Sequence, residues 1–378
     1  MKLEILAIAT MLNFSYAFES DLVRSEIHYD AISTSAIPSF KNTENIDNQM
    51  YAGGFNDLLP YVVAVPDQED AGSCLYMSLT GTMEWWNNFL NNLTDNNRED
   101  LSERYYMALM KENIGQSRIS NWRTDNIERI NEFSKLALNE QYPFTKGYFK
   151  YNDDGDRIQS SPDDEKSEYG TGFNWLSFRD DIDKEYHNEL ITFPKFSRDV
   201  IYADPNQNQW AVASAPTDIV SRIKEALVKN KTPVNVIYTH HGFWHAVIIV
   251  GFNDYAPTQG CPYTTGYAPF MNEKASKYEA EAQEQDSESK RDKLLSKARM
   301  AKKKATQVQE LFDKQGGCAK NGVFYVRDSI NPSDDMPIYD YDPTQVGEEA
   351  HLNPEVVFRE YQWFETTGNH AYQIKAIK

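Results

Sequence analysis

The sequence of 378 residues is poor in cysteine, with only Cys74, Cys261 and Cys318. Because three is an odd number, at least one thiol has no disulfide partner within the chain. Basic residues are also scarce: 38 lysines and arginines stand against 57 aspartates and glutamates, a formal net charge of −19. A surface of that charge repels nucleic-acid phosphates and anionic lipid headgroups, so we expect neither as a partner.

Long apolar runs are missing as well. No stretch beyond the N-terminus approaches the ~20 residues that a membrane-spanning helix needs, so no membrane span is expected. The sequence begins with Met1 and Lys2, followed by a short apolar run at 5–12 and small residues up to Ala17. This order is typical of a secretory signal peptide at 1–17 and predicts a secreted or periplasmic protein. The alternative is an ordinary buried N-terminal strand or helix.

Two halves of different character follow a polar N-terminal extension at 18–58. In the half at 59–200, apolar residues at helical spacing after Ser73 predict a helix with one apolar stripe, and a further helix is expected at 124–138. In the half at 201–378, short apolar runs between turn residues predict strands. These strands are expected at 234–239, 244–252, 355–365 and 370–377. The fold class expected is therefore α+β, a helical lobe followed by a β-rich lobe.

One segment of the second half, Met271 to Gln315, contains no glycine or proline. Its apolar residues alternate steps of four and three, which is the spacing of a coiled-coil-like seam. These residues are Leu294, Ala298, Ala301, Ala305, Val308 and Phe312. Because the polar stretch Glu284–Asp292 interrupts the seam, we expect an inserted α-helical hairpin at 271–315.

The three cysteines divide into two groups around this segment. Cys261 and Cys318 lie just outside its two ends. A disulfide between them would close the base of the hairpin and stabilise it by roughly 4 kcal/mol. The alternative is two unrelated buried thiols. In either case Cys74 is left over, in the first turn of the helix predicted after Ser73, where the helix dipole favours a thiolate.

The residues around Cys74 suggest a chemical role rather than simple packing. Taken alone, a cysteine that enters an apolar helix is usually a core thiol. Here Gly-Ser-Cys ends at Cys74 and Gln68 lies shortly before it, a pattern that resembles the active-site segment of papain-like cysteine peptidases. Later, His-Ala-Val begins at His245 and is followed by apolar residues, Val-Gly and an aromatic, which resembles the histidine strand of that family. Finally, Gly322–Ser329 resembles the strand that carries its asparagine, with Asp328 in the asparagine position.

The resemblance implies a papain-like two-lobed fold, whose second lobe is β-barrel-like, and a peptidase that hydrolyses peptide or protein substrates. It implies that Cys74 is the nucleophile and that His245 is its ion-pair partner and later the general acid. Asp328 would orient His245, with Asn331 as the alternative. Gln68 and the backbone amide of Cys74 would hold the oxyanion. No metal or organic cofactor is needed.

Four positions depart from the family pattern. Leu75 and Ile330 replace tryptophans beside the cysteine and the orienting residue, and Ala71 replaces a cysteine that forms a disulfide next to the site. Asp328 replaces an asparagine, although a carboxylate can also accept a hydrogen bond from an imidazole, orient it and favour its charged form.

Two other functions stay open on the sequence alone. One is an amide hydrolase or transferase of the same fold that acts on a non-protein substrate. The other is a secreted, inactive binding protein that uses the hairpin and the acidic surface, and it is favoured by Leu75, Ile330 and Asp328. A metal site at His240, His241 and His245 is a weaker alternative because no cysteine or carboxylate clusters beside these histidines. A calcium site at 152–168 is weaker too, because the segment lacks the regular alternation and closing glutamate of the standard helix-loop-helix site. The sequence specifies no oligomeric state.

Overall fold

The computed structural model describes residues 53–63, 65, 68, 73–103, 105–107, 109, 131, 135–138, 190–204, 215–240, 243–258, 262–329 and 356–377. Several sequence predictions fall outside these ranges. They concern the signal peptide at 1–17, most of the extension at 18–58, the acidic segment 152–168, Ala71, His241, Cys261, Ile330 and Asn331.

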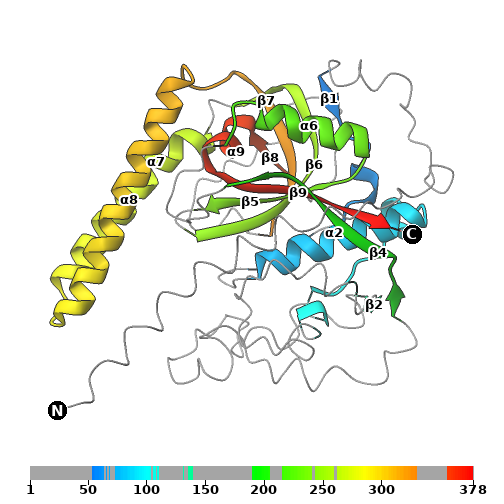
Figure 1. Ribbon diagram of the computed structural model, residues 1–378, viewed down its shortest axis with the longest axis horizontal. Coiled ribbons are helices and arrows are strands. Elements are labelled where there is room, and N and C mark those ends of the chain that lie inside the picture. Colours follow the sequence, from blue (N-terminus) through cyan, green and yellow to red (C-terminus); the bar gives the residue numbers. More distant parts are fainter. Residues whose placement is uncertain are drawn as a thin grey trace, which may run out of the picture.

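An antiparallel sheet forms the framework of the described chain, with strand order β4-β9-β5-β6-β7-β8 and β1 paired to β6 (Figure 1). Its strands are β1 Gly54–Phe55, β4 Lys195–Ala203, β5 Val234–His240, β6 Phe243–Pro257, β7 Asn321–Arg327, β8 Val357–Glu360 and β9 Gly368–Ile377. The β-barrel-like closure that we expected is wrong for these strands, because β4 and β8 lie at opposite ends of the order. The short strand β8 passes directly into a helix, so it does not extend around to β4.

The strands expected at 234–239, 244–252 and 370–377 are confirmed as β5, β6 and β9. The strand expected at 355–365 is only partly right, since Tyr361–Thr367 is the helix α9. Aromatic and β-branched residues in this segment favour a strand, but tertiary contacts override that preference. The Gln362 side chain donates to the Gly317 carbonyl at 2.6 Å and accepts from the Ala319 amide at 2.9 Å, while Trp363 is fully buried.

The prediction of a helix at 124–138 is also wrong for the last residues of that range. Lys135–Leu136 is the strand β2, which pairs with β3, Ile191–Thr192, and Leu138 forms a bridge with Leu101. The partners of these residues come from distant segments, which helical periodicity within the segment cannot indicate.

The helix α2, Cys74–Leu90, lies against the sheet and is buried from Cys74 to Phe89. The single apolar stripe that we expected is therefore too narrow, because polar side chains of this helix are buried as well. They are accommodated by hydrogen bonds: Asn235 of β5 donates to the hydroxyls of Ser78 and Thr82, both at 2.9 Å. Trp86 Nε1 donates to the Ile374 carbonyl of β9 at 2.8 Å.

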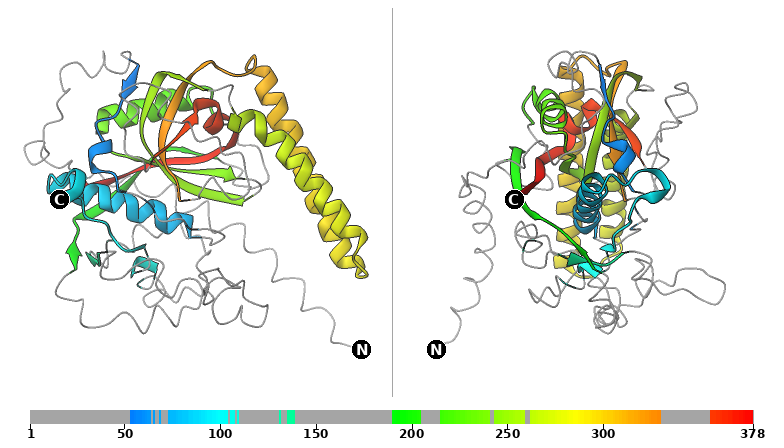
Figure 2. Two further views of the ribbon diagram at one scale, coloured as in Figure 1. Left: turned by 180° about the vertical axis from the view of Figure 1, so that it is seen from behind. Right: turned by 90° about the vertical axis from the view of Figure 1, so that its right-hand side faces the viewer.

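The helices α7, Pro262–Gln283, and α8, Glu288–Lys314, lie side by side and project from the sheet, whereas α6, Ile219–Asn230, packs on it (Figures 1 and 2). The first helix starts earlier than the predicted residue 271. The residues Ala298, Ala301, Ala305 and Val308 of the predicted seam are buried. None of the described helices is both long and apolar enough to cross a membrane.

Glu360, the last residue of β8, attaches this helical pair to the sheet. Its carboxylate accepts from the backbone N–H and the hydroxyl of Thr264 in α7, at 2.7 and 2.9 Å. On the α8 side, Thr258 donates to the carbonyls of Lys320 and Ala319, at 3.0 and 2.6 Å. The chain before α7 and the chain after α8 are thus adjacent. A disulfide between Cys261 and Cys318 stays a prediction, because Cys261 lies outside the described residues.

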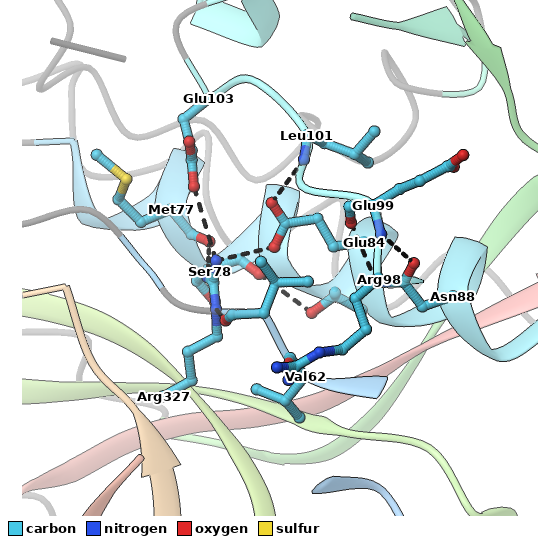
Figure 3. A network of polar contacts seen from close by, with 12 residues as sticks. Val62, Met77, Ser78, Glu84, Asn88, Arg98, Glu99, Leu101, Glu103 and Arg327 are labelled. Carbon is cyan, nitrogen blue, oxygen red and sulfur yellow. Dashed lines mark hydrogen bonds and ion pairs between the residues drawn. The ribbon is translucent and has the colours of Figure 1, made fainter. Parts of the chain in front are cut away.

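A buried arginine joins α2 to the sheet (Figure 3). The guanidinium of Arg327, at the end of β7, lies 2.8 Å from the carboxylate of Glu84 and 3.7 Å from that of Glu103. It also donates to the carbonyls of Met77 and Val63, at 2.9 and 2.8 Å. Because a side chain at Gly81 would come within 2.1 Å of the guanidinium, only glycine permits this approach.

Within the part of the chain that the structure describes, this network holds more carboxylates than cations. Burial raises the pKa of Glu103 to about 8, against the lowering effect of Arg327 and with a further raising effect of Asp100. Burial likewise raises the pKa of Glu84 well above its ordinary value. The folded protein therefore retains a proton near neutral pH that the unfolded chain releases close to pH 4.5.

We expect the free energy of unfolding to fall as pH rises from about 4.5 to about 8, because the unfolded state binds fewer protons over that window. Glu103→Gln carries a permanently neutral amide and should show a weaker dependence. Urea unfolding at pH 5 and pH 8 measures the effect. Glu310→Gln, at an exposed position of α8, is the control and should behave like the unmodified protein. An equal dependence in Glu103→Gln and the unmodified protein would contradict the assignment.

Candidate active site

Cys74 is the first residue of α2, and its thiol is free and buried. The Sγ atom lies 4.0 Å from the backbone oxygen of Trp244, the residue before His245 in β6. N–H groups in the first turn of a helix have no partners within the helix, and the positive end of the helix dipole favours a negative charge there. The fold therefore places this sulfur at the positive end of the α2 dipole.

His245 and Asp328 meet between β6 and the end of β7. The distance from His245 Nε2 to Asp328 Oδ1 is 2.7 Å, and both side chains are completely buried. The strand pairing explains the meeting, since Ile248 of β6 pairs with Arg327, the residue before Asp328. Thus two residues that are 83 positions apart form a hydrogen-bonded pair next to Cys74.

The pKa of His245 is set by opposing effects. Burial lowers it, but the charge and hydrogen bond of Asp328, together with the hydrogen bond and charge of Cys74, raise it to about 9. Because Asp328 engages Nε2, the nitrogen left for the thiol is Nδ1. Below about pH 9 the ring is consequently an imidazolium, which stabilises a neighbouring thiolate.

Gln68 is held beside Asp328 by the next residue along the chain. The Ser329 hydroxyl donates to Gln68 Oε1 at 2.5 Å, and the Gln68 backbone N–H donates to the Ser329 carbonyl at 2.8 Å. With the oxygen of the amide directed to Ser329, its NH₂ group is directed away from Ser329. The sequence indicated Gln68 and Asp328 but assigned no role to Ser329, although it directly follows Asp328.

Aromatic residues pack around the histidine. The ring of Tyr238 in β5 is 5.5 Å from that of His245, and Trp363 of α9 is 4.8 Å from Tyr238, both edge-on. These contacts limit rotation of the imidazole. Neither residue belongs to a motif that the sequence makes visible, and Trp363 lies in a segment that was expected to be a strand.

Arg359 was missed as well. Its Nη2 donates to Asp328 Oδ2 at 2.9 Å, so both carboxylate oxygens of Asp328 are engaged. No motif around residue 359 indicates this contact, which depends on the pairing of β8 with β7.

The sequence matches no protein-family model and no curated protein. Among solved structures, xylellain, a cysteine protease from Xylella fastidiosa, is 10% identical, with 93% of this chain and 96% of that chain covered and a TM-score of 0.40. The cysteine protease and lectin-like domains of Cwp84, a surface layer associated protein of Clostridium difficile, are 12% identical, with 86% and 51% covered and a TM-score of 0.39.

The chain resembles papain-like cysteine proteases of known structure. It spans about half the length of the Cwp84 chain. At this level of identity and TM-score, any functional argument rests on the distances within the site.

The pKa of the His245 ring depends on its neighbours, so its measurement tests whether Cys74 and His245 interact. Because Cys74 contributes to the raised pKa of His245, Cys74→Ala should lower that pKa from about 9, by ~1 unit. Ring-proton NMR across pH 5–10 measures it, with His245→Gln identifying the signal among the seven histidines. Thr306→Ala, at an exposed position of α8, should leave the titration unchanged. If Cys74→Ala leaves it unchanged too, the two side chains do not interact.

Proposed function

We propose that this protein is a cysteine peptidase that hydrolyses peptide bonds through the thiolate of Cys74. The observation that carries the proposal is the Nε2–Oδ1 distance of 2.7 Å between His245 and Asp328, in a fully buried pair that interacts with the free thiol of Cys74. A nucleophile, an acid–base group and an orienting carboxylate in contact are the requirements of thiolate acyl transfer.

The first half of the reaction forms an acyl-enzyme. The Cys74 thiolate attacks the carbonyl carbon of the scissile bond, so that a C–S bond forms and the carbonyl oxygen becomes an oxyanion. The His245 imidazolium then donates its proton to the nitrogen of the leaving amine as the C–N bond breaks. The second half reverses these roles: His245 takes a proton from water, the hydroxide attacks the acyl carbon, and the thiolate leaves.

Gln68 and the backbone N–H of Cys74 are the proposed donors to the oxyanion. Two contacts from Ser329 hold Gln68, and the Cys74 N–H belongs to the first turn of α2, where intrahelical partners are lacking. Donors held in place before the reaction stabilise developing charge without reorganisation, which is often the largest single contribution to catalysis.

Export belongs to the same proposal. It rests on the signal-peptide pattern at 1–17, and a secreted or periplasmic location would also favour the disulfide between Cys261 and Cys318. The helical pair α7 and α8 lies outside the reacting groups, and its attachment through Glu360 does not involve them.

An epoxysuccinyl inhibitor tests the nucleophile. We expect one covalent adduct per chain by intact mass, located on Cys74, together with cleavage of an unfolded protein substrate. Cys74→Ala should form no adduct and cleave nothing. Circular dichroism confirms that both proteins are folded.

Each other result contradicts the proposal in its own way. A folded, unmodified protein that forms no adduct is the inactive binding protein that Asp328 and Leu75 favour. An adduct without cleavage of any peptide points instead to an amide hydrolase or transferase with a non-protein substrate.

The oxyanion donors predict a separate kinetic pattern. Gln68→Ala should lower kcat by ~10²-fold with little change in KM, because the oxyanion exists only in the transition state and intermediate. Ser329→Ala leaves the amide present but no longer held, so a smaller loss of kcat is expected. Ser276→Ala, at an exposed site in α7, should match the unmodified protein. A rise in KM alone for Gln68→Ala would assign this residue to substrate binding.

A further inference from the structure

The buried carboxylate of Asp328 has a cationic partner on each oxygen. Oδ1 is 2.7 Å from His245 Nε2, and Oδ2 accepts from Arg359 Nη2 at 2.9 Å. The side chain of Arg359 is only 2% exposed, and that of Asp328 is fully buried. The mechanism uses His245 and Asp328 but leaves a buried arginine beside them without a role.

The other charged groups nearby have partners of their own. Glu360 follows Arg359 but accepts from Thr264 of α7, and Arg327 precedes Asp328 but pairs with Glu84 of α2. On the far side of His245 lies Cys74, and the ring of Tyr238 packs against the imidazole from β5. Among the described residues, Arg359 is therefore the cation paired with Asp328 when the imidazole is neutral.

This balance matters because His245 must both give and accept a proton. A buried, uncompensated carboxylate would hold the imidazolium too firmly, which makes it a weak acid toward the leaving amine and delays the return to the neutral base. Paired with a guanidinium, the carboxylate has part of its charge offset, yet it still offers Oδ1 as an acceptor to His245.

We propose that Arg359 is a positioning residue that makes an aspartate suitable for the orienting position of the triad. It holds Oδ2, directs Oδ1 at His245 and offsets part of the carboxylate charge behind the imidazole. The inference rests on the proposed function, because the positioning serves catalysis only if Cys74 and His245 carry out acyl transfer.

The test combines NMR titration of His245 with the pH dependence of peptide hydrolysis in four proteins. These are the unmodified protein, Arg359→Met, Asp328→Asn and the double variant. Arg359→Met removes the cation, so the His245 pKa and the alkaline limit of kcat/KM should rise by ~1 unit, while kcat falls by ~10-fold. Asp328→Asn should lower the same pKa, because it removes the carboxylate and leaves the arginine.

The double variant keeps the test decisive if Arg359→Met does not fold. It contains neither buried charge, so it avoids leaving one of them unpaired. Compared with Asp328→Asn, it should show a His245 pKa higher by ~1 unit and a partial return of kcat, since a cation near the imidazole has been removed. A purely structural arginine would produce neither change.

Arg198→Met is the matched control, because Arg198 of β4 is half-buried against Tyr372 and distant from the triad in the sheet order. It should leave the titration and the pH profile unchanged. The inference is overturned if removing Arg359 leaves the His245 titration unchanged in both backgrounds, the unmodified protein and Asp328→Asn. Absence of hydrolysis by the unmodified protein would instead reject the proposed function, and the titration can still be read in any folded variant.

Discussion

The described structure depends on one buried guanidinium. Arg327 connects β7 to α2 through a carboxylate of Glu84 and the carbonyl of Met77, and it does so one residue before Asp328. Removing either partner of a buried ion pair leaves an uncompensated charge, so such a contact tolerates little displacement. The helix that begins with Cys74 and the strand that ends before Asp328 are therefore held in one fixed relation.

A buried arginine also compensates the carboxylate of Asp328 at the candidate catalytic residues. Asp328 lies between His245 and Arg359, so two buried arginines at the ends of neighbouring strands, β7 and β8, hold the carboxylates on which the site depends. The two arrangements differ in the sign of the charge that is in excess. Among the described residues around Arg327, the carboxylates outnumber the cation, and burial keeps a proton on Glu103 up to about pH 8. Among those around Asp328, a guanidinium and an imidazolium share one carboxylate when His245 is charged.

Much of the site could be read from the sequence, because its reactive residues belong to short local motifs. Cys74, His245, Asp328 and Gln68 each lie within a few residues of the pattern that indicated them. β5, β6 and β9 were predictable for the same reason, since apolar runs between turn residues are a local signal. The segment after β8 was not, because α9 owes its conformation to the contacts of Gln362 and Trp363 with residues from elsewhere in the chain.

The sequence by itself determined which candidate catalytic residues are present, their order along the chain and the position of Cys74 at the start of a helix. Only the tertiary structure decided that the sheet stays open, that α2 is buried on every side, and that Arg327 and Arg359 balance the buried carboxylates. The physical reason is that a charge pair between distant residues leaves no periodic or local trace in the sequence. Its energy depends on burial and distance, and these arise only when β7, β8 and α2 pack together.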